Sequence, residues 1–378
     1  FWWAGILLII SWLSLTMTAA TSGISRMGPA GVRLIRFSAY FFTGAYVVVL
    51  VNTPSKMKFI LTILYLNILI QAVLSTAQRL GWIGSFYPAL YTQTYGSLPV
   101  GTLSAHHKQI GIVMLLGLGI GLTYLRVKKN LFMRFVNIIF IGLMFSASVF
   151  ALSRTAWLGM AGMALGYFFI YKGRSIGMGL LLIIGLVGLT LLMTQLEVDL
   201  LGVLEEDVSP VLIDRVERLG VEGITRDRQI IYETVPNRIA RNPWIIFIGT
   251  GFQNQSSFFY GSGAHNNYLH VWMELGIIGF IVYLGMLRQV LYDLWSGSKR
   301  LTSNFEKTLA MDTFAVFIGI LFTMLVGETL WAQPSMRTMT AQIMILVGLA
   351  VAQLHNWYKV EVNEAEKKLI NKSFNKRL

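Results

Sequence analysis

The sequence contains no cysteine and little charge. Its 378 residues include 31 Lys and Arg but only 18 Asp and Glu. The absence of cysteine excludes disulfides, thiolate metal sites and cysteine nucleophiles. Charged residues make up 13% of the chain and hydrophobic residues 55%, with a mean hydropathy of +0.61. Because this leaves too little polar surface for a soluble globule of this length, the composition indicates a polytopic membrane protein.

Ten apolar runs are long enough to form membrane-spanning helices. They cover residues 1–20, 34–52, 58–77, 109–126, 135–152, 156–172, 177–195, 268–287, 309–331 and 338–356. The sequence therefore predicts an all-α, polytopic membrane helical bundle. Phe1 lies inside an apolar run without an initiator Met, so we expect the full-length protein to begin earlier, with one or more further helices.

The basic residues indicate membrane topology rather than nucleic-acid binding. The formal net charge is +13, and many basic residues lie in short connections between apolar runs. Four basic groups fall on one side of the ten-helix layout, which the positive-inside rule makes cytoplasmic. These groups lie within residues 126–134, 172–174, 288–307 and 372–377. Arg26, Arg33 and Arg36 fall on the outer side and do not fit this layout.

The layout divides the chain into four segments. Residues 1–195 form N-terminal transmembrane helices, 196–264 an outer subdomain, 265–357 C-terminal transmembrane helices, and 358–378 a basic cytoplasmic tail. In the outer subdomain, residues 227–241 are predicted to form a helix that Asn242-Pro243 ends. Residues 249–263 combine glycines with aromatic residues, and we expect a flexible loop there.

Arginine supplies all the positive charge of the outer subdomain. Between Glu197 and Ala264 the sequence holds ten acids and six arginines but no lysine. A guanidinium can bind phosphate oxygens in pairs and stays charged near a bilayer. The alternative is that the arginines pair with acids of the same loop, which we favour for Arg215 and Arg218 but not for Arg226 and Arg228.

Three charged residues lie beside predicted outer membrane ends. Lys108 opens the fourth span, Arg154 lies between two spans, and Glu328 lies near the end of the ninth. Charges at a membrane boundary are costly, so they tend to be paired or functional. Snorkelling to the interface is an equally good explanation for Lys108. Glu328 is a candidate partner for Arg154 or for Arg337.

A histidine stands at the mouth of an apolar helix. His265-Asn266 is followed, after nine residues, by Gly276-Ile277-Ile278-Gly279. The helix is predicted to run over 268–287, with Glu274 as its only acid. At 100° per residue, both glycines fall near the face of His265 and Glu274 on the opposite face. The alternative is structural: His265 and Asn266 cap the helix while the glycines let a neighbouring helix pack closely.

These segments resemble the O-antigen polymerase and O-antigen ligase superfamily. The histidine, the asparagine, the nine-residue spacing and the Gly-x-x-Gly all match the signature of that superfamily. Ser153-Arg154-Thr155 at a helix junction agrees in type and order. So does Arg228 four residues before Tyr232, followed by Asn242-Pro243 and Gly249-Thr250-Gly251-Phe252. The resemblance is densest over 153–287 and implies a fold like the class C glycosyltransferases, with about twelve spans in full-length members.

The resemblance implies glycosyl transfer on the outer face of a bacterial inner membrane. The donor would be a polyprenyl-pyrophosphate-linked glycan and the acceptor a hydroxyl group, with inversion at the anomeric carbon and without a metal or other cofactor. Histidine suits a general base near neutral pH, and arginines can stabilise a leaving pyrophosphate. The expected catalytic residues are His265, Arg228 and Arg154. The expected substrate-binding residues are Lys108, Arg226, Asn266 and Glu328.

The acceptor distinguishes the two activities of the superfamily. A polymerase extends a second lipid-linked glycan, whereas a ligase transfers the glycan to lipid A-core. The continuation Asn266-Asn267-Tyr268-Leu269 resembles polymerases more closely, so polymerase is the first choice and ligase the alternative. Polysaccharide chain-length regulators and flippases are the protein partners that this implies. A lipid-linked glycan transporter is less favoured, because the two halves of the sequence show no matching interrupted helices.

Overall fold

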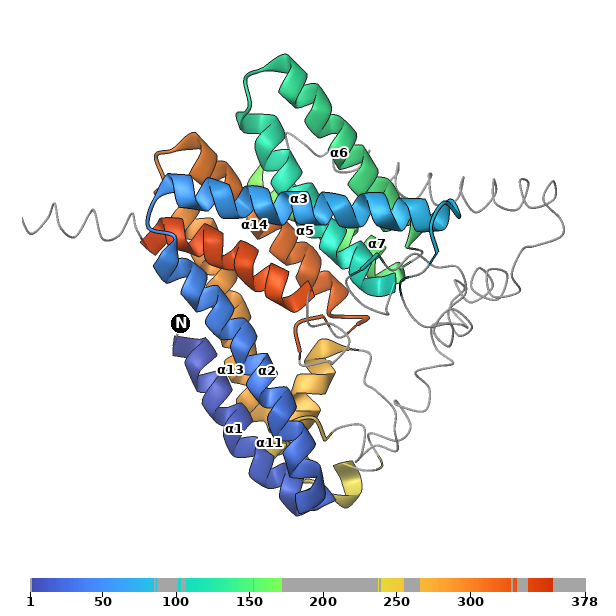
Figure 1. The fold of residues 1–378 in the computed structure, drawn as a ribbon. Helices are drawn as coiled ribbons and strands as arrows, with labels where there is room; N and C mark the ends of the chain where they lie inside the picture. Colours follow the sequence, from blue (N-terminus) through green and yellow to red (C-terminus); the bar gives the residue numbers. More distant parts are fainter. Residues whose placement is uncertain are drawn as a thin grey trace, which may run out of the picture.

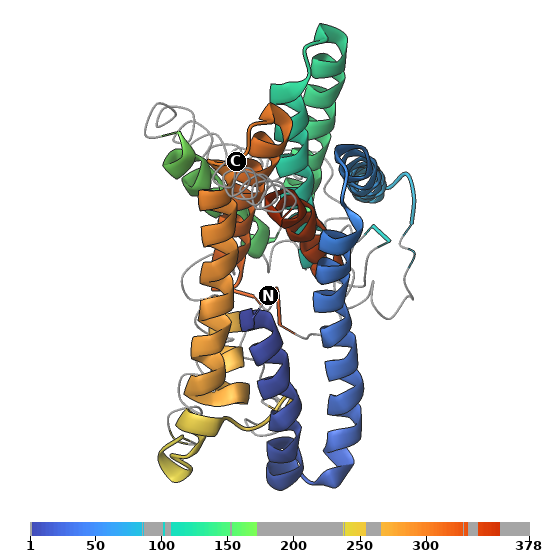
Figure 2. The ribbon, with the colours of Figure 1, turned by 90° about the vertical axis from the view of Figure 1, so that its left-hand side faces the viewer.

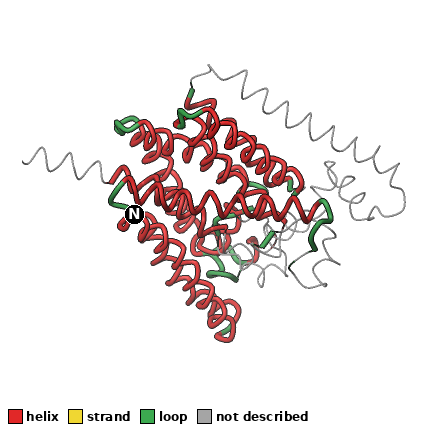
Figure 3. The backbone as a smooth tube through the Cα atoms, turned by 45° about the horizontal axis from the view of Figure 1, so that its top comes forward, coloured by secondary structure: helices red, strands yellow, loops and turns green. Residues whose placement is uncertain are grey.

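In the part of the chain that the structure describes, every regular element is an α-helix (Figures 1 to 3). The computed structural model describes residues 2–84, 86, 101–102, 107–151, 153–171, 237, 239–254, 266–327, 329–331 and 339–355. Six of the helices are long and apolar enough to cross a membrane, and the Met339–His355 helix is shorter but apolar. The prediction of an all-α polytopic membrane protein is confirmed. The predicted span 177–195 and the tail 358–378 lie outside the described residues.

A hairpin of two helices begins the chain. Helix α1 (Trp2–Ser22) is followed directly by α2 (Ile24–Leu50), and Gly23, with φ 88°, forms the connection. The two helices run together with α13 along one side of the molecule (Figures 1 and 2). The prediction that the second span begins near residue 34 is wrong, because Arg26, Arg33 and Arg36 all lie within α2. A helix tolerates arginines at its end where they project beyond the hydrocarbon layer.

Four helices form a second group. They are α3 (Pro54–Arg79), α5 (His107–Val127), α6 (Leu131–Phe150) and α7 (Arg154–Ile170). Polar caps begin three of them: the side chains of Thr53, Asn130 and Ser153 each accept from a backbone N–H of the first turn. Such caps satisfy amides that have no partner within the helix.

Small residues let α7 pack closely on α14 (Asn304–Thr323). A Cβ added at Gly319 would lie 2.6 Å from the carbonyl oxygen of Gly159, and one at Gly159 would lie 2.6 Å from Thr323 Cγ2. Close backbone approach of this kind is a common basis for helix association in membranes. The buried Asp312 of α14 also pairs with Arg126 at the end of α5 and accepts from Thr123 Oγ1 at 2.7 Å.

The helices after the predicted outer subdomain differ from the predicted spans. Helix α13 covers Asn267–Ser298, but its backbone is non-helical at Gly276, so the expected regular helix over 268–287 is wrong. The face assignment made for Gly276, Gly279 and Glu274 assumed an unbroken helix and fails with it. Helix α14 ends at Thr323, whereas the sequence predicted a helix to residue 331. Residues 324–327 and 329–331 form turns and bends.

Candidate functional site

The start of α13 is fixed by two asparagines. The Asn266 side chain caps the helix, because its Oδ1 accepts from the amides of Tyr268 and Leu269 at 3.0 Å each. Its Nδ2 donates to the carbonyl of Leu325 at 3.1 Å. Asn267 is fully buried. Its backbone N–H donates to Met324 O at 2.8 Å, and its side-chain Oδ1 accepts from the backbone N–H groups of Leu330 and Trp331. Asn266 therefore caps α13, as the structural alternative predicted.

The side chain of Asn267 accepts hydrogen bonds from backbone N–H groups in the segment that follows α14. Leu330 and Trp331 lie outside any helix, so their amides need acceptors when buried. Asn267 Oδ1 provides the acceptor at 3.2 Å and 3.0 Å, while its Nδ2 donates to Tyr283 OH at 2.5 Å. One side chain therefore ties the first turn of α13 to the second half of that helix and to residues 330–331.

Two glycines meet where α13 is interrupted. Gly276 has φ 67° and ψ −173°, and Gly249, after the short helix α11 (Ile245–Ile248), has φ 72° and ψ −178°. A side chain at Gly249 would overlap the carbonyl of Glu274, and one at Gly276 would overlap the carbonyl of Phe247. This backbone region is available almost only to glycine. Glycine does allow close packing at Gly276, as the structural alternative predicted, but the neighbour is the end of the short helix α11 and the turn after it.

Two backbone carbonyls at the interruption of α13 accept hydrogen bonds from the turn that follows Gly249. Thr250 N donates to Met273 O at 2.8 Å, and Gly251 N donates to Glu274 O at 3.0 Å. In an unbroken helix these carbonyls would accept from residues 277 and 278. Because unpaired carbonyls are costly in a membrane, the turn is needed for α13 to break here.

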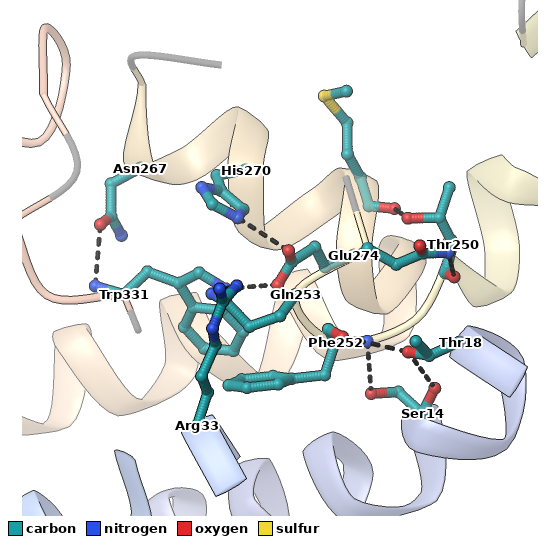
Figure 4. Close-up of polar contacts among 12 residues, drawn as sticks. Ser14, Thr18, Arg33, Thr250, Phe252, Gln253, Asn267, His270, Glu274 and Trp331 are labelled. Atoms are coloured by element: carbon teal, nitrogen blue, oxygen red, sulfur yellow. Dashed lines mark hydrogen bonds and ion pairs between the residues drawn. The ribbon is translucent and has the colours of Figure 1, made fainter. Parts of the chain in front are cut away.

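Residues 250–254 are held from the other side by α1. Phe252 N donates to Ser14 Oγ at 3.2 Å, and Thr18 Oγ1 donates to Phe252 O at 3.0 Å (Figure 4). Thr21 Oγ1 donates to Thr250 O at 3.0 Å. Phe252 itself is fully buried. The expectation of a flexible loop is wrong for this described part, since the turn is anchored to both α1 and α13.

A buried polar cluster lies one turn into α13. Glu274 accepts from Trp331 Nε1 at 2.7 Å, and its other carboxylate oxygen lies 2.8 Å from His270 Nε2 (Figure 4). Glu274 is 1% exposed and His270 5%. The Trp331 ring also packs against Phe37 and Phe252, with centroids 4.9 Å and 5.5 Å away. The cluster therefore joins α2, α13 and the segment after α14.

Most of the predicted site residues fall outside the described residues. These are His265, Arg226, Arg228 and Glu328. Arg154 is the first residue of α7 and Lys108 the second of α5, but their side chains are outside the described part too. Asn266 is the one predicted site residue whose side chain is described.

The described neighbours of these positions nevertheless converge. Asn266 and Asn267, next to His265, bond to Leu325 and Met324, which precede Glu328. A Cβ at Gly327 would lie 3.3 Å from Thr155 Cγ2, beside Arg154. A Cβ added at Gly111, three residues after Lys108, would overlap the side chain of Ala156. The chain positions that flank Lys108, Arg154, His265 and Glu328 thus belong to one end of the bundle.

A comparison with known families finds one match. Residues 139–284 match the family model described as O-antigen ligase. This match supports the resemblance to the O-antigen polymerase and ligase superfamily over that part of the chain. No curated protein matches the chain.

The superfamily match contains both glycines that meet at the break of α13. It runs from α6 through α7 and the predicted outer subdomain to Leu284 of α13. The matched region therefore includes the two segments whose contacts fix α13 at its break. Within the described residues, no group of three or more His, Cys, Asp or Glu side chains is placed to hold a metal ion.

Sequence reasoning missed three residues of this region. Glu274 was noted as the only acid of its helix, but its partners His270 and Trp331 were not foreseen. Trp331 was placed inside a helix, which hid its role. Gln109, beside Lys108, is fully buried, and neither of its amide atoms finds a hydrogen-bond partner among the described residues. A glutamine at the start of an apolar helix was the only signal in the sequence for it.

Proposed function

We propose that this protein is a polysaccharide polymerase of the O-antigen type. It transfers a glycan from a polyprenyl-pyrophosphate donor to a hydroxyl group of a second lipid-linked glycan. The carrying observation is the superfamily match over 139–284, which includes His265 and its asparagine and glycine signature. The convergence of the ends of α5, α7 and α13 with residues 324–327 supports a site there.

The proposed reaction is a single displacement at the anomeric carbon. The acceptor oxygen forms a bond to that carbon as the bond to the phosphate oxygen breaks, which inverts the configuration. The lipid pyrophosphate leaves with the electron pair, and His265 takes the proton of the acceptor hydroxyl. Arg154 and Arg228 stabilise the negative charge that grows on the pyrophosphate. No metal or other cofactor takes part in this scheme.

The remaining residues bind and position the substrates. Lys108 and Arg226 contribute positive charge, and Glu328 accepts from sugar hydroxyls or holds Arg154. Asn266 fixes the direction in which the chain enters α13 from His265, since its side chain bonds on both sides of that point. Gln109 offers an amide without a partner in the described part of the chain, which suits a hydrogen bond to substrate.

The proposal places the protein in the bacterial inner membrane, with its active site on the periplasmic face. The predicted outer subdomain, 196–264, would cover the acceptor side of the site. The cytoplasmic tail, 358–378, would contact anionic lipid. Chain-length regulators and flippases of the same polysaccharide would be its partners.

A ligase is the second candidate, because the matching family model is described as O-antigen ligase. A ligase would use the same donor and the same residues. Its acceptor would be lipid A-core in place of a second lipid-linked glycan.

Glycan gels of a deletion strain of the native host separate these functions. The strain is complemented with the wild type and with His265→Ala, expressed to equal levels. A polymerase predicts single repeat units in the deletion strain and a ladder that the wild type restores but His265→Ala does not. Long lipid-linked polymer beside uncapped core would show a ligase. Arg228→Ala with full activity would remove Arg228 from the scheme.

A further inference from the structure

The arginines of α2 have no acidic partner in the described part of the chain. Arg26, Arg33 and Arg36 are exposed, and the first acid of the whole sequence is Glu197. Arg33 Nη1 donates to Gln253 Oε1 at 2.9 Å (Figure 4). Gln253 has φ 56°, which is unusual outside glycine, and it belongs to the turn anchored on α1 and α13. The guanidinium of Arg33 is therefore held at the turn that contains Gln253, and within the described residues one of its five donors is used.

The depth of Arg33 in the membrane suits a lipid headgroup. Helix α2 ends at Leu50, and at 1.5 Å per residue the distance from Arg33 to Leu50 is about 26 Å. The hydrocarbon layer of a bilayer is about 30 Å thick. If Leu50 lies at one boundary, Arg33 and Arg36 lie near the other, where lipid phosphates are found. Arg26 lies beyond them.

An apolar cavity lies along the same face of α2. Eleven residues separate Arg33 from Gly44, so the two lie about 20° apart around the helix. Gly44 lines a cavity of about 290 Å³ between α1, α2, α13 and the Met339–His355 helix. Its wall is formed mainly by apolar side chains, among them Leu8, Phe41, Val48, Leu287 and Ile343.

One end of the cavity carries a carboxylate, and the arginines of α2 lie beyond the other end. Leu330 lines the cavity, and the next residue, Trp331, packs against Phe37, which lies about one turn from Arg33 on α2. Asp293, which accepts from Gln289 at 2.7 Å, lines it toward the far end of α13. A carboxylate repels a phosphate and arginines attract one. An amphiphile with a phosphate headgroup would therefore bind with its headgroup at Arg33 and its chain in the cavity.

We propose that this face of α2 binds the lipid carrier of the acceptor. The pyrophosphate lies on Arg33, with Arg36 and Arg26 beside it, and the polyprenyl chain enters the cavity. The assignment to the acceptor rests on the proposed polymerase function, which needs two lipid-linked substrates. The donor is expected at Arg154 on α7, which packs against α5 and α14, whereas α2 packs against α1. The start of α13, after His265, lies between the two.

The number of bound carriers tests the site without requiring turnover. Native mass spectrometry of the full chain, purified in detergent, is used to count bound undecaprenyl pyrophosphate. We expect two equivalents for the wild type and one for Arg33→Gln or Ala45→Phe, since Ala45 lines the cavity. The matched controls are Arg134→Gln, an exposed arginine of α6, and Ala39→Phe, an exposed residue of α2 outside the cavity wall. Both controls should keep two equivalents.

Competition and kinetics complete the test. Excess phosphatidylglycerol should leave the second equivalent bound; displacement would mean a site for bulk anionic lipid and would overturn the proposal. A single equivalent in the wild type, or two in Arg33→Gln, would also overturn it. In a polymerisation assay, Arg33→Gln should raise the acceptor concentration for half-maximal rate about tenfold, the loss of one charge-assisted contact. The donor dependence should not change, and Arg33→Lys should recover part of the loss.

The outcome for this site is separable from the outcome for the proposed function. If the deletion strain shows a ligase, two bound equivalents that fall to one in Arg33→Gln still establish a carrier site on α2, but its assignment to the acceptor fails. If the strain shows a polymerase and the wild type binds one equivalent, the polymerase proposal stands and the α2 site fails.

Discussion

Replacing Gly276 by alanine should disrupt the join between α13 and the turn at Gly249. Its backbone, with φ 67° and ψ −173°, lies in a region that costs a side-chain-bearing residue about 1–3 kcal/mol. The added Cβ would also overlap the backbone of Phe247 and lie 2.5 Å from Ile248 N. Overpacking against a backbone that cannot rotate away costs about 1–3 kcal/mol more. We therefore expect Gly276→Ala to lose roughly 2–6 kcal/mol of stability.

Thermal unfolding of the purified protein in detergent, followed by tryptophan fluorescence, measures this loss. The matched control is Gly142→Ala in α6, where an added Cβ meets nothing within 4 Å. That control should be neutral or gain about 0.5–1 kcal/mol, because alanine is favoured over glycine inside a helix. Equal unfolding temperatures for the two variants would refute the account of the break. A less stable but fully active Gly276→Ala would refute its link to the site.

Three further substitutions probe the buried polar contacts by the same unfolding assay. Asn267→Leu should cost about 3 kcal/mol or more, because two buried amides lose their acceptor; no change would show that water replaces the side chain. Glu274→Leu should cost about 2–4 kcal/mol and Glu274→Gln about 1 kcal/mol, since glutamine still accepts from Trp331; equal losses would contradict the hydrogen-bond account. Asp312→Ala should cost about 2–4 kcal/mol by leaving Arg126 half-buried without its partner; substitution of both residues should restore part of the loss, and its failure to do so would argue against the ion pair.

Much of the helical framework could be predicted from the sequence. Long apolar runs identify helices in a membrane because every backbone polar group must find a partner within the segment. The predicted end of the helix before Asn242 is confirmed in the described residues, where Arg241 is helical and Asn242 is not. The starts of α3 and α13 carry caps at Thr53 and Asn266 that follow ordinary preferences.

The interruptions of the helices could not be predicted in the same way. Hydropathy continues through Gly276 and through residues 324–331, so an apolar run alone predicts a helix there. The backbone departs from the helix because distant groups satisfy it: Thr250 and Gly251 at one place, Asn267 at the other. These partners lie tens of residues away in the sequence. Helix periodicity contains no information about them.

The candidate site was predictable in its signature but not in its supporting contacts. His265, Asn266 and the two glycines stand out by spacing, and Arg154 and Lys108 by charge in an apolar setting. The contacts of Glu274 were not predicted, because an unbroken helix would direct it away from the site. The position of Arg33 was missed because residues 21–33 were assigned to a connection. Both errors come from treating each apolar segment as independent of its neighbours.

The break in α13 also explains why a glycine signature would accompany the histidine. Close packing of two helices would need a small residue but not a positive φ. Gly276 of α13 has a close backbone neighbour and also a positive φ, so glycine is required there for two reasons. The freed carbonyls of Met273 and Glu274 accept from the turn after α11, the described end of the predicted outer subdomain. In the sequence, Arg228 precedes that turn and His265 follows it. The two glycines therefore join the end of α11, which lies between Arg228 and His265 in the sequence, to the break in α13. A reaction that needs an arginine at the pyrophosphate and a histidine at the acceptor hydroxyl would depend on such a fixed point, because a small displacement of either group can cost far more in rate than in stability.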